Sequence, residues 1–358
     1  MRKGEDNVLS DYDMILNIIN SSFIVKDYYI RNDNIIEFKV DTVKDLKKSF
    51  ADIVKQLKLK NFIAFLRKSN NDLIISVRKI THRIHYSKRK PLILFLMVLI
   101  TITIDGWLRV KSFMEISEFK LDPLLFILFY VLAVIGIIGF HEIGHMIASS
   151  LYGVKSSLPY FIPGLPGYLP TFGAIITSEE PPLNRDALFD LGISGPIAGL
   201  IITLIIAIPG VLTSTPLTSL PINETQTLPL NVSLIMMMIF TIIGGTQEEI
   251  ILSPLGFATW LGFIITFINL LPAWQLDGGH IARAVLGRKK HDIATTISIL
   301  VLILLGFWLM ALVLLILSMR RIEIRPLDDV TSISKGRKYI FIFIIFLIIL
   351  LAPIPTYL

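Results

Sequence analysis

Long apolar runs constrain the fold of this chain more than any other feature. The first extends from Pro91 to about Leu108, the second from Leu124 to about Tyr152 and the third from Leu191 to about Leu212. An apolar helix of about 18 or more residues can cross the hydrocarbon core of a bilayer. Charged residues make up 17% of the chain, against about 25% in an ordinary soluble protein. We therefore expect an integral membrane protein rather than a soluble enzyme.

Further apolar segments follow in the second half of the chain. Pro254 to Leu271 reads as a full span, and Tyr339 to Leu351 as the last one. Val232 to Ile243 is too short to cross a bilayer, which indicates a partial or re-entrant helix. Ile293 to Ser318 is interrupted by Gly306 and is either one long span or a helical hairpin. The prediction is an α-helical polytopic membrane protein with about six transmembrane segments.

The stretch from Gly153 to Asp190 is too rich in proline and glycine for a spanning helix and too apolar for an ordinary loop. Irregular backbone at membrane depth is tolerated only where protein or a water-filled cavity shields it. Phe172 to Thr177 reads as a short strand within this stretch. We expect a re-entrant, β-containing loop, whose exposed strand edge could hold an unwound peptide by β-addition.

Residues 1–90 have a different character from residues 91–358. Val43 to Leu57 is amphipathic, and the segments on either side alternate as β hairpins do. This pattern predicts a small soluble α+β domain, followed by a basic linker and then a transmembrane domain over residues 91–358. Basic residues directly before a span place that end in the cytoplasm, which accounts for the net charge of +6 without any nucleic-acid partner.

The second span contains the motif His-Glu-x-x-His, formed by His141, Glu142 and His145. On a helix, His145 lies about 40° round from His141 and about 6 Å along the axis, so both imidazoles can reach one ion. Glu142 lies off the line of the two histidines, where it can accept a proton from a metal-bound water. Because ionisable residues inside a membrane segment are costly and usually functional, we predict a catalytic zinc site.

A hydrolytic zinc site usually has three protein ligands and one open position. The chain contains no cysteine, so the third ligand must be a histidine or a carboxylate. Asp277 is the main candidate, because the span from Pro254 would place it at a depth similar to that of the histidines. Glu248, Glu249 and His280 are competing candidates.

From residue 91 onward, the sequence resembles the site-2 protease family of intramembrane zinc metalloproteases, in the branch with an N-terminal extension found in archaea and plastids. The resemblance rests on the His-Glu-x-x-His motif in the second span and on Leu276 to His280 (Leu-Asp-Gly-Gly-His) at the end of a later one. Phe172-Gly173-Ala174 and the run from Gly195 to Gly199 stand between them in the expected order. No segment has the length of an inserted PDZ domain.

The resemblance implies that His141, His145 and Asp277 bind zinc and that Glu142 is the general base. It also implies that Asn269, eight residues before Asp277, polarises the scissile carbonyl or stabilises its oxyanion. The expected activity is hydrolysis of peptide bonds within transmembrane helices of protein substrates, near the cytoplasmic side of the cell membrane. A partner of the N-terminal domain is not indicated.

Two other functions use the same residues. A metal-ion transporter could employ His141, Glu142, His145 and Asp277 as a transit site. A membrane metallopeptidase of the CaaX type would take a glutamate as its third ligand. For the small residues between Gly195 and Gly199, close helix packing is the favoured interpretation and direct substrate contact the alternative.

Overall fold

The computed structural model describes residues 2–31, 35–70, 72–80, 89–117, 121–178, 180–216, 230–244, 250–319 and 325–354, with only the backbone for residues 2–10. Backbone contacts divide the chain into two compact units. The N-terminal unit comprises the described residues up to 80 together with residues 180–188 and 325–334, and the second unit comprises the rest.

The N-terminal unit is an antiparallel sheet covered by two helices. Its elements in chain order are α1 (Arg2–Asn20), β1 (Val25–Ile30), β2 (Ile36–Val40), α2 (Leu46–Leu59), β3 (Phe62–Ser69) and β4 (Asp72–Lys79). The strand order is β1-β2-β4-β3. Alternate residues of β2, Ile36, Phe38 and Val40, are buried, because successive side chains of a strand point to opposite faces. The apolar face of α2 covers the same core.

Two segments from later in the chain extend this sheet beside β3. The N–H of Leu66 donates to the carbonyl of Leu327 at 2.9 Å, and the N–H of Leu327 donates to the carbonyl of Pro182 at 2.8 Å. Leu327 belongs to the hydrophobic core of the unit, and the partly buried Leu183 packs against it. The unit is thus built from three separate stretches of chain, two of which lie beyond the predicted boundary at residue 90.

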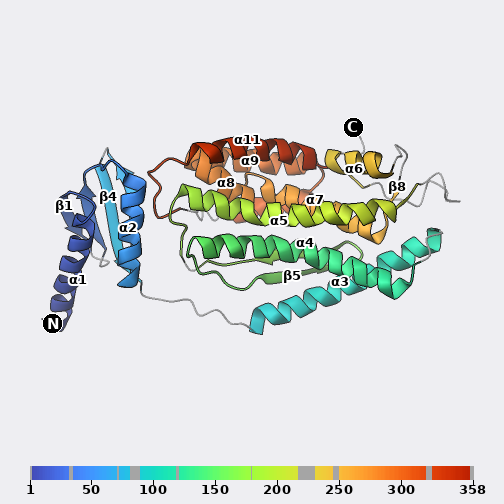
Figure 1. Cartoon of the computed structure of the whole chain (residues 1–358), viewed down its shortest axis with the longest axis horizontal. Helices are drawn as coiled ribbons and strands as arrows, with labels where there is room; N and C mark the ends of the chain where they lie inside the picture. The colour runs from blue at the N-terminus through green and yellow to red at the C-terminus, as the bar shows by residue number, and fades with distance from the viewer. Residues whose placement is uncertain are drawn as a thin grey trace. The chain divides into compact units, whose positions relative to one another are not determined.

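The second unit is helical, with one β hairpin (Figure 1). Its elements are α3 (Arg89–Ile116), α4 (Pro123–Leu151), β5 (Tyr160–Leu165), β6 (Leu169–Ile175), α5 (Arg185–Leu212, whose first turn belongs to the N-terminal unit), β7 (Thr215–Pro216), α6 (Leu234–Gly244), β8 (Ile250–Ile251), α7 (Pro254–Leu270), α8 (Asp277–Leu286), α9 (Arg288–Leu304), α10 (Trp308–Met319) and α11 (Lys335–Leu351). Among the described residues, α3, α4 and α5 are long and apolar enough to cross a bilayer, and α6, α7 and α10 are shorter apolar helices. Much of their apolar surface faces outward, as expected of a membrane protein.

Two segments left open by the sequence have a definite form. Residues 293–318 are not one helix, because the chain breaks at Gly306, whose φ of +85° ends α9. The helices α9 and α10 pack against each other as a helical hairpin. The helix α6 has 11 residues and is about 16 Å long, roughly half the thickness of the hydrocarbon core.

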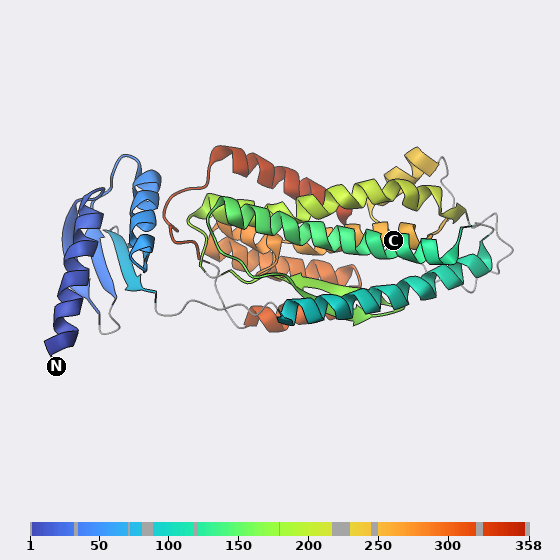
Figure 2. The ribbon, with the colours of Figure 1, turned by 60° about the horizontal axis from the view of Figure 1, so that its bottom comes forward.

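A buried carboxylate in α3 anchors the tip of the β5–β6 hairpin, which lies along α3 (Figure 2). Asp105 is fully buried and accepts hydrogen bonds from the N–H of Gly167 at 2.7 Å, from Arg109 Nε at 2.7 Å and from the hydroxyl of Tyr130. The guanidinium of Arg109 also lies 3.2 Å from the ring centroid of Phe257. Since a buried charge is stable only when paired and hydrogen-bonded, this network fixes the hairpin tip against α3 and α4.

Candidate metal centre

The helix α4 carries the His-Glu-x-x-His motif in its second half. Asp122 caps its N-terminus by accepting a hydrogen bond from the N–H of Leu125 at 2.9 Å, and Pro123 occupies the first turn, where a missing N–H costs nothing. His141 and His145 lie on one face, with ring centroids 4.9 Å apart. His141 and Glu142 are buried, so the motif lies inside the helical unit.

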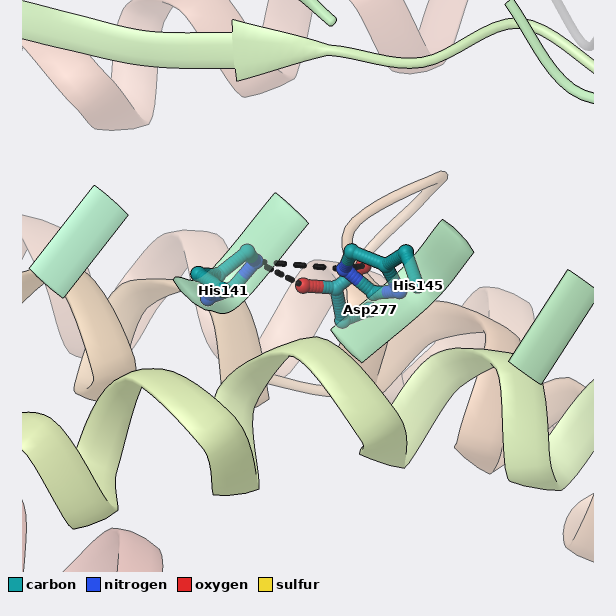
Figure 3. Close-up of side chains that lie close together, drawn as sticks. All are labelled: His141, His145 and Asp277. Atoms are coloured by element: carbon teal, nitrogen blue, oxygen red, sulfur yellow. Dashed lines mark hydrogen bonds and ion pairs between the residues drawn. The ribbon is translucent and has the colours of Figure 1, made fainter. Parts of the chain in front are cut away.

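Asp277 meets the two histidines from a different element. It is the first residue of α8, which follows α7 after a short loop. Its carboxylate oxygens lie 3.1 Å from His141 Nε2 and 3.3 Å from His145 Nε2, and the two Nε2 atoms are 3.2 Å apart. Figure 3 shows the three side chains converging from the two helices. Within the described part of the chain, they form the one group of histidine and acidic side chains arranged to hold a metal ion.

These spacings suit a tetrahedral metal ion. An ion about 2.1 Å from each of its donors holds neighbouring donors about 3.4 Å apart in tetrahedral geometry. The two Nε2 atoms are 3.2 Å apart, Asp277 Oδ2 lies 3.1 Å from His141 Nε2, and Asp277 Oδ1 lies 3.3 Å from His145 Nε2, so all three separations are close to that value. The donor set of two imidazole nitrogens and one carboxylate oxygen leaves a fourth position for water, as catalytic zinc sites do.

A backbone carbonyl sets the orientation of His145. Its Nδ1 lies 2.8 Å from the carbonyl oxygen of Leu191 in α5. Because a carbonyl can only accept, Nδ1 carries the hydrogen, and the lone pair of a neutral imidazole is then on Nε2. A hydrogen bond of this kind fixes the ring and the tautomer of a metal ligand.

Glycines on one face of α5 leave space for the two imidazoles and for the backbone of Asp277. A Cβ on Gly195 would lie 2.1 Å from His145 Nε2, one on Gly199 would lie 3.2 Å from the Cβ of His141, and one on Gly192 would lie 2.7 Å from the carbonyl oxygen of Asp277. The spacing of three and four residues places these glycines within an arc of about 60°. The favoured packing role of Gly195 to Gly199 is confirmed, and the packing surfaces are the imidazoles themselves.

A polar cluster joins three helices two turns beyond His145. The carboxylate of Asp190 in α5 accepts hydrogen bonds from Arg337 of α11, with Nε at 2.7 Å, and from the hydroxyl of Tyr152 at the end of α4. Asp190 directly precedes Leu191, and the cluster therefore holds α5 where its carbonyl meets His145.

The other predicted site residues take separate places. Glu142 is buried on α4 but is not one of the three grouped donors. Asn269 lies near the C-terminal end of α7, partly buried, and its side chain makes no hydrogen bond to any described residue. His280 follows Asp277 by one turn of α8, beside Gly192, and is not part of the donor group. Glu248 and Glu249 lie outside the described residues.

Sequence reasoning missed Gly192, the carbonyl of Leu191 and the Asp190 cluster. Gly192 could have been found, because Gly192, Gly195 and Gly199 share one helical face when their spacing is plotted at 100° per residue. The backbone carbonyl and the pairing of Asp190 with Arg337 join residues far apart in sequence, and no local pattern indicates them.

The fold and the site define a helical membrane protein with a His-His-Asp metal centre built on a His-Glu-x-x-His helix. The family model described as Peptidase family M50 matches residues 129–311, just over half of the chain and all three donors. The chain belongs to peptidase family M50, the site-2 protease family.

Curated relatives are similar over the same part of the chain. The probable zinc metalloprotease EGY2, chloroplastic, of Oryza sativa subsp. indica is 32% identical over 212 residues, covering 54% of this chain and 36% of the relative. The probable zinc metalloprotease EGY1, chloroplastic, of Arabidopsis thaliana is 29% identical over 231 residues, covering 62% of this chain and 42% of the relative. The match thus spans less than half the length of these relatives. No solved structure matches this chain.

Proposed function

We propose that this protein is an intramembrane zinc endopeptidase that hydrolyses peptide bonds within substrate transmembrane helices near the cytoplasmic side of the cell membrane. One observation carries the proposal: three donors spaced for a tetrahedral ion lie on and beside an apolar helix, with a separate buried carboxylate next to them. Membership of peptidase family M50 and similarity to probable zinc metalloproteases support the same activity.

We assign His141, His145 and Asp277 as the residues that would hold zinc. Zinc bound there would polarise the scissile carbonyl and lower the pKa of the attacking water. Glu142 would take the proton from that water and pass it to the leaving nitrogen. Asn269, with a side-chain amide that no described residue engages, is available to donate to the carbonyl oxygen as it gains negative charge.

Substrate would be held in extended form against the hairpin. The helix α3 packs chiefly against β5, and β6 has one edge that no other strand pairs with among the described residues. A substrate helix must unwind before its peptide bond can be attacked, and β-addition stabilises the unwound backbone through main-chain hydrogen bonds.

Proline substitutions in this strand test the hairpin. Replacing Ala174 in β6, or Ile176 directly after it, by proline removes one backbone N–H that could donate to an added strand. We expect each variant to bind zinc normally and to cleave a single-span substrate much more slowly in proteoliposomes. The wild-type cleavage rate in a folded, zinc-loaded proline variant would exclude β-addition at this edge.

Measurement of bound zinc separates this proposal from the CaaX-type alternative. Asp277→Asn should lose zinc, because among the described residues the carboxylate of Asp277 lies within 3.3 Å of both imidazoles. Under this proposal Glu248→Gln and Glu249→Gln should retain it. Elemental analysis of the three purified variants gives the answer. The reverse pattern would assign the third ligand to the glutamate pair and contradict the proposed centre.

We further propose about six membrane segments, a soluble N-terminal domain in the cytoplasm and membrane proteins as substrates. Membranes from cells carrying Glu142→Gln should accumulate uncleaved substrate stubs that are absent from wild-type membranes, and comparative proteomics would identify them. Metal uptake that survives Glu142→Gln, with no accumulated stubs, would favour the transporter alternative.

A further inference from the structure

Trp274, in the loop between α7 and α8, has two features that each cost free energy. Its φ is +41°, in the left-handed region, which is a strained conformation for a bulky residue. Its indole Nε1 is buried and has no hydrogen-bond acceptor among the described residues. Burying an unpaired donor costs about 1–3 kcal/mol. A glycine would relieve the backbone strain, so the tryptophan side chain itself requires an explanation.

Two side chains of α9 hold the backbone of Trp274 in this conformation. Its N–H donates to Thr295 Oγ1 at 3.0 Å, and its carbonyl oxygen lies 3.1 Å from His291 Nε2. Since the carbonyl can only accept, His291 Nε2 carries the hydrogen. The backbone N–H and the backbone carbonyl of Trp274 are therefore both hydrogen-bonded to α9. These two hydrogen bonds offset the cost of the strained backbone conformation.

The loop also packs directly beneath the start of α8. A Cβ on Gly279 would lie 2.3 Å from the carbonyl oxygen of Trp274, and a Cβ on Gly278 would lie 1.9 Å from the carbonyl oxygen of Leu270. The two glycines that follow Asp277 thus allow α8 to begin directly against this loop. Trp274 is three residues before Asp277 and five after Asn269, so its rigidly held backbone lies in the segment that carries the site.

We propose that the indole N–H of Trp274 donates a hydrogen bond to a backbone carbonyl of the substrate segment bound at the metal centre. This inference rests on the proposed function. A helix that unwinds for cleavage frees carbonyl oxygens that have lost their intrahelical partners. A carbonyl of this kind would accept the hydrogen bond that the buried indole N–H of Trp274 lacks. This acceptor is present only when substrate is bound. Trp274 is accordingly a substrate-binding residue and not a ligand of the metal.

Peptide binding to the Glu142→Gln chain tests the inference without the complication of cleavage. The probe is a synthetic single-span peptide with a central Asn-Pro pair, bound to the full-length, zinc-loaded protein in lipid nanodiscs. Adding Trp274→Phe removes the N–H and keeps an aromatic ring. We expect Kd to rise about 3- to 10-fold, as the loss of one hydrogen bond implies, with zinc content unchanged.

Trp260→Phe is the matched control, because the indole N–H of Trp260 is already bonded to the carbonyl oxygen of Asn231 at 2.8 Å. That variant should bind the peptide with unchanged Kd. An unchanged Kd for Trp274→Phe would overturn the inference, as would a loss of zinc, which would show that Trp274 only supports the metal centre. If the Glu142→Gln chain binds no peptide at all, the proposed function itself is wrong, and the inference falls with it.

Discussion

Glu142→Gln is expected to abolish proteolysis while leaving zinc bound. The amide is close to the carboxylate in size but cannot accept the proton of the attacking water, and general-base catalysis contributes typically about 10²- to 10⁴-fold. Glu142 is buried but is not one of the three grouped donors, so we expect the ion to stay bound without its charge. Elemental analysis of the purified chain and cleavage of a single-span substrate in proteoliposomes measure the two properties separately.

His141→Ala provides the comparison, because it removes one of the three donors and should lose both zinc and activity. Together the two variants separate the base from the ligands. Cleavage by Glu142→Gln at the wild-type rate would contradict the mechanism, and loss of zinc from that variant would make Glu142 a ligand.

Gly195→Ala is expected to lose zinc although it changes no ligand. The added methyl carbon would lie 2.1 Å from His145 Nε2, a separation that no pair of nonbonded heavy atoms tolerates, so either the imidazole or α5 must move. The same imidazole is held by the carbonyl of Leu191 at 2.8 Å on the same helix, which leaves it no simple alternative position. Zinc content and thermal unfolding of the zinc-loaded and chelated protein would be measured.

Gly139→Ala is the control for this substitution. Gly139 lies in α4, two residues before His141, and a Cβ added there meets nothing within 4 Å. Alanine is also the better helix former by about 1 kcal/mol, so this variant should keep its zinc and its stability. Full zinc occupancy in Gly195→Ala would show that α5 can shift away without cost, and would contradict the role assigned to the glycine face.

Local patterns in the sequence predicted the elements well. The long apolar runs became α3, α4 and α5, because about 20 apolar residues form a helix wherever a bilayer removes water from the backbone. The pairing of His141 with His145 follows from helical geometry alone. Phe172 to Thr177 overlaps β6, which lies in the loop that the sequence marks as irregular.

Long-range contacts were not predictable in the same way. Nothing near Leu327 or Pro182 indicates that these segments would complete the sheet of residues 1–80, since a strand edge accepts any backbone of suitable shape. The break at Gly306 was one of two open interpretations, because a glycine within an apolar run is compatible with both a continuous helix and a hairpin.

The sequence by itself therefore determined a membrane-embedded His-Glu-x-x-His helix in a chain without cysteine, since helical periodicity and apolar length act over neighbouring residues. Only the tertiary structure decided that Asp277 meets both histidines, that Gly192, Gly195 and Gly199 leave space for these residues, and that α9 holds Trp274 in a strained conformation. These features arise where helices distant in sequence pack together, and their cause is the exclusion of overlapping atoms and the pairing of buried polar groups across that packing.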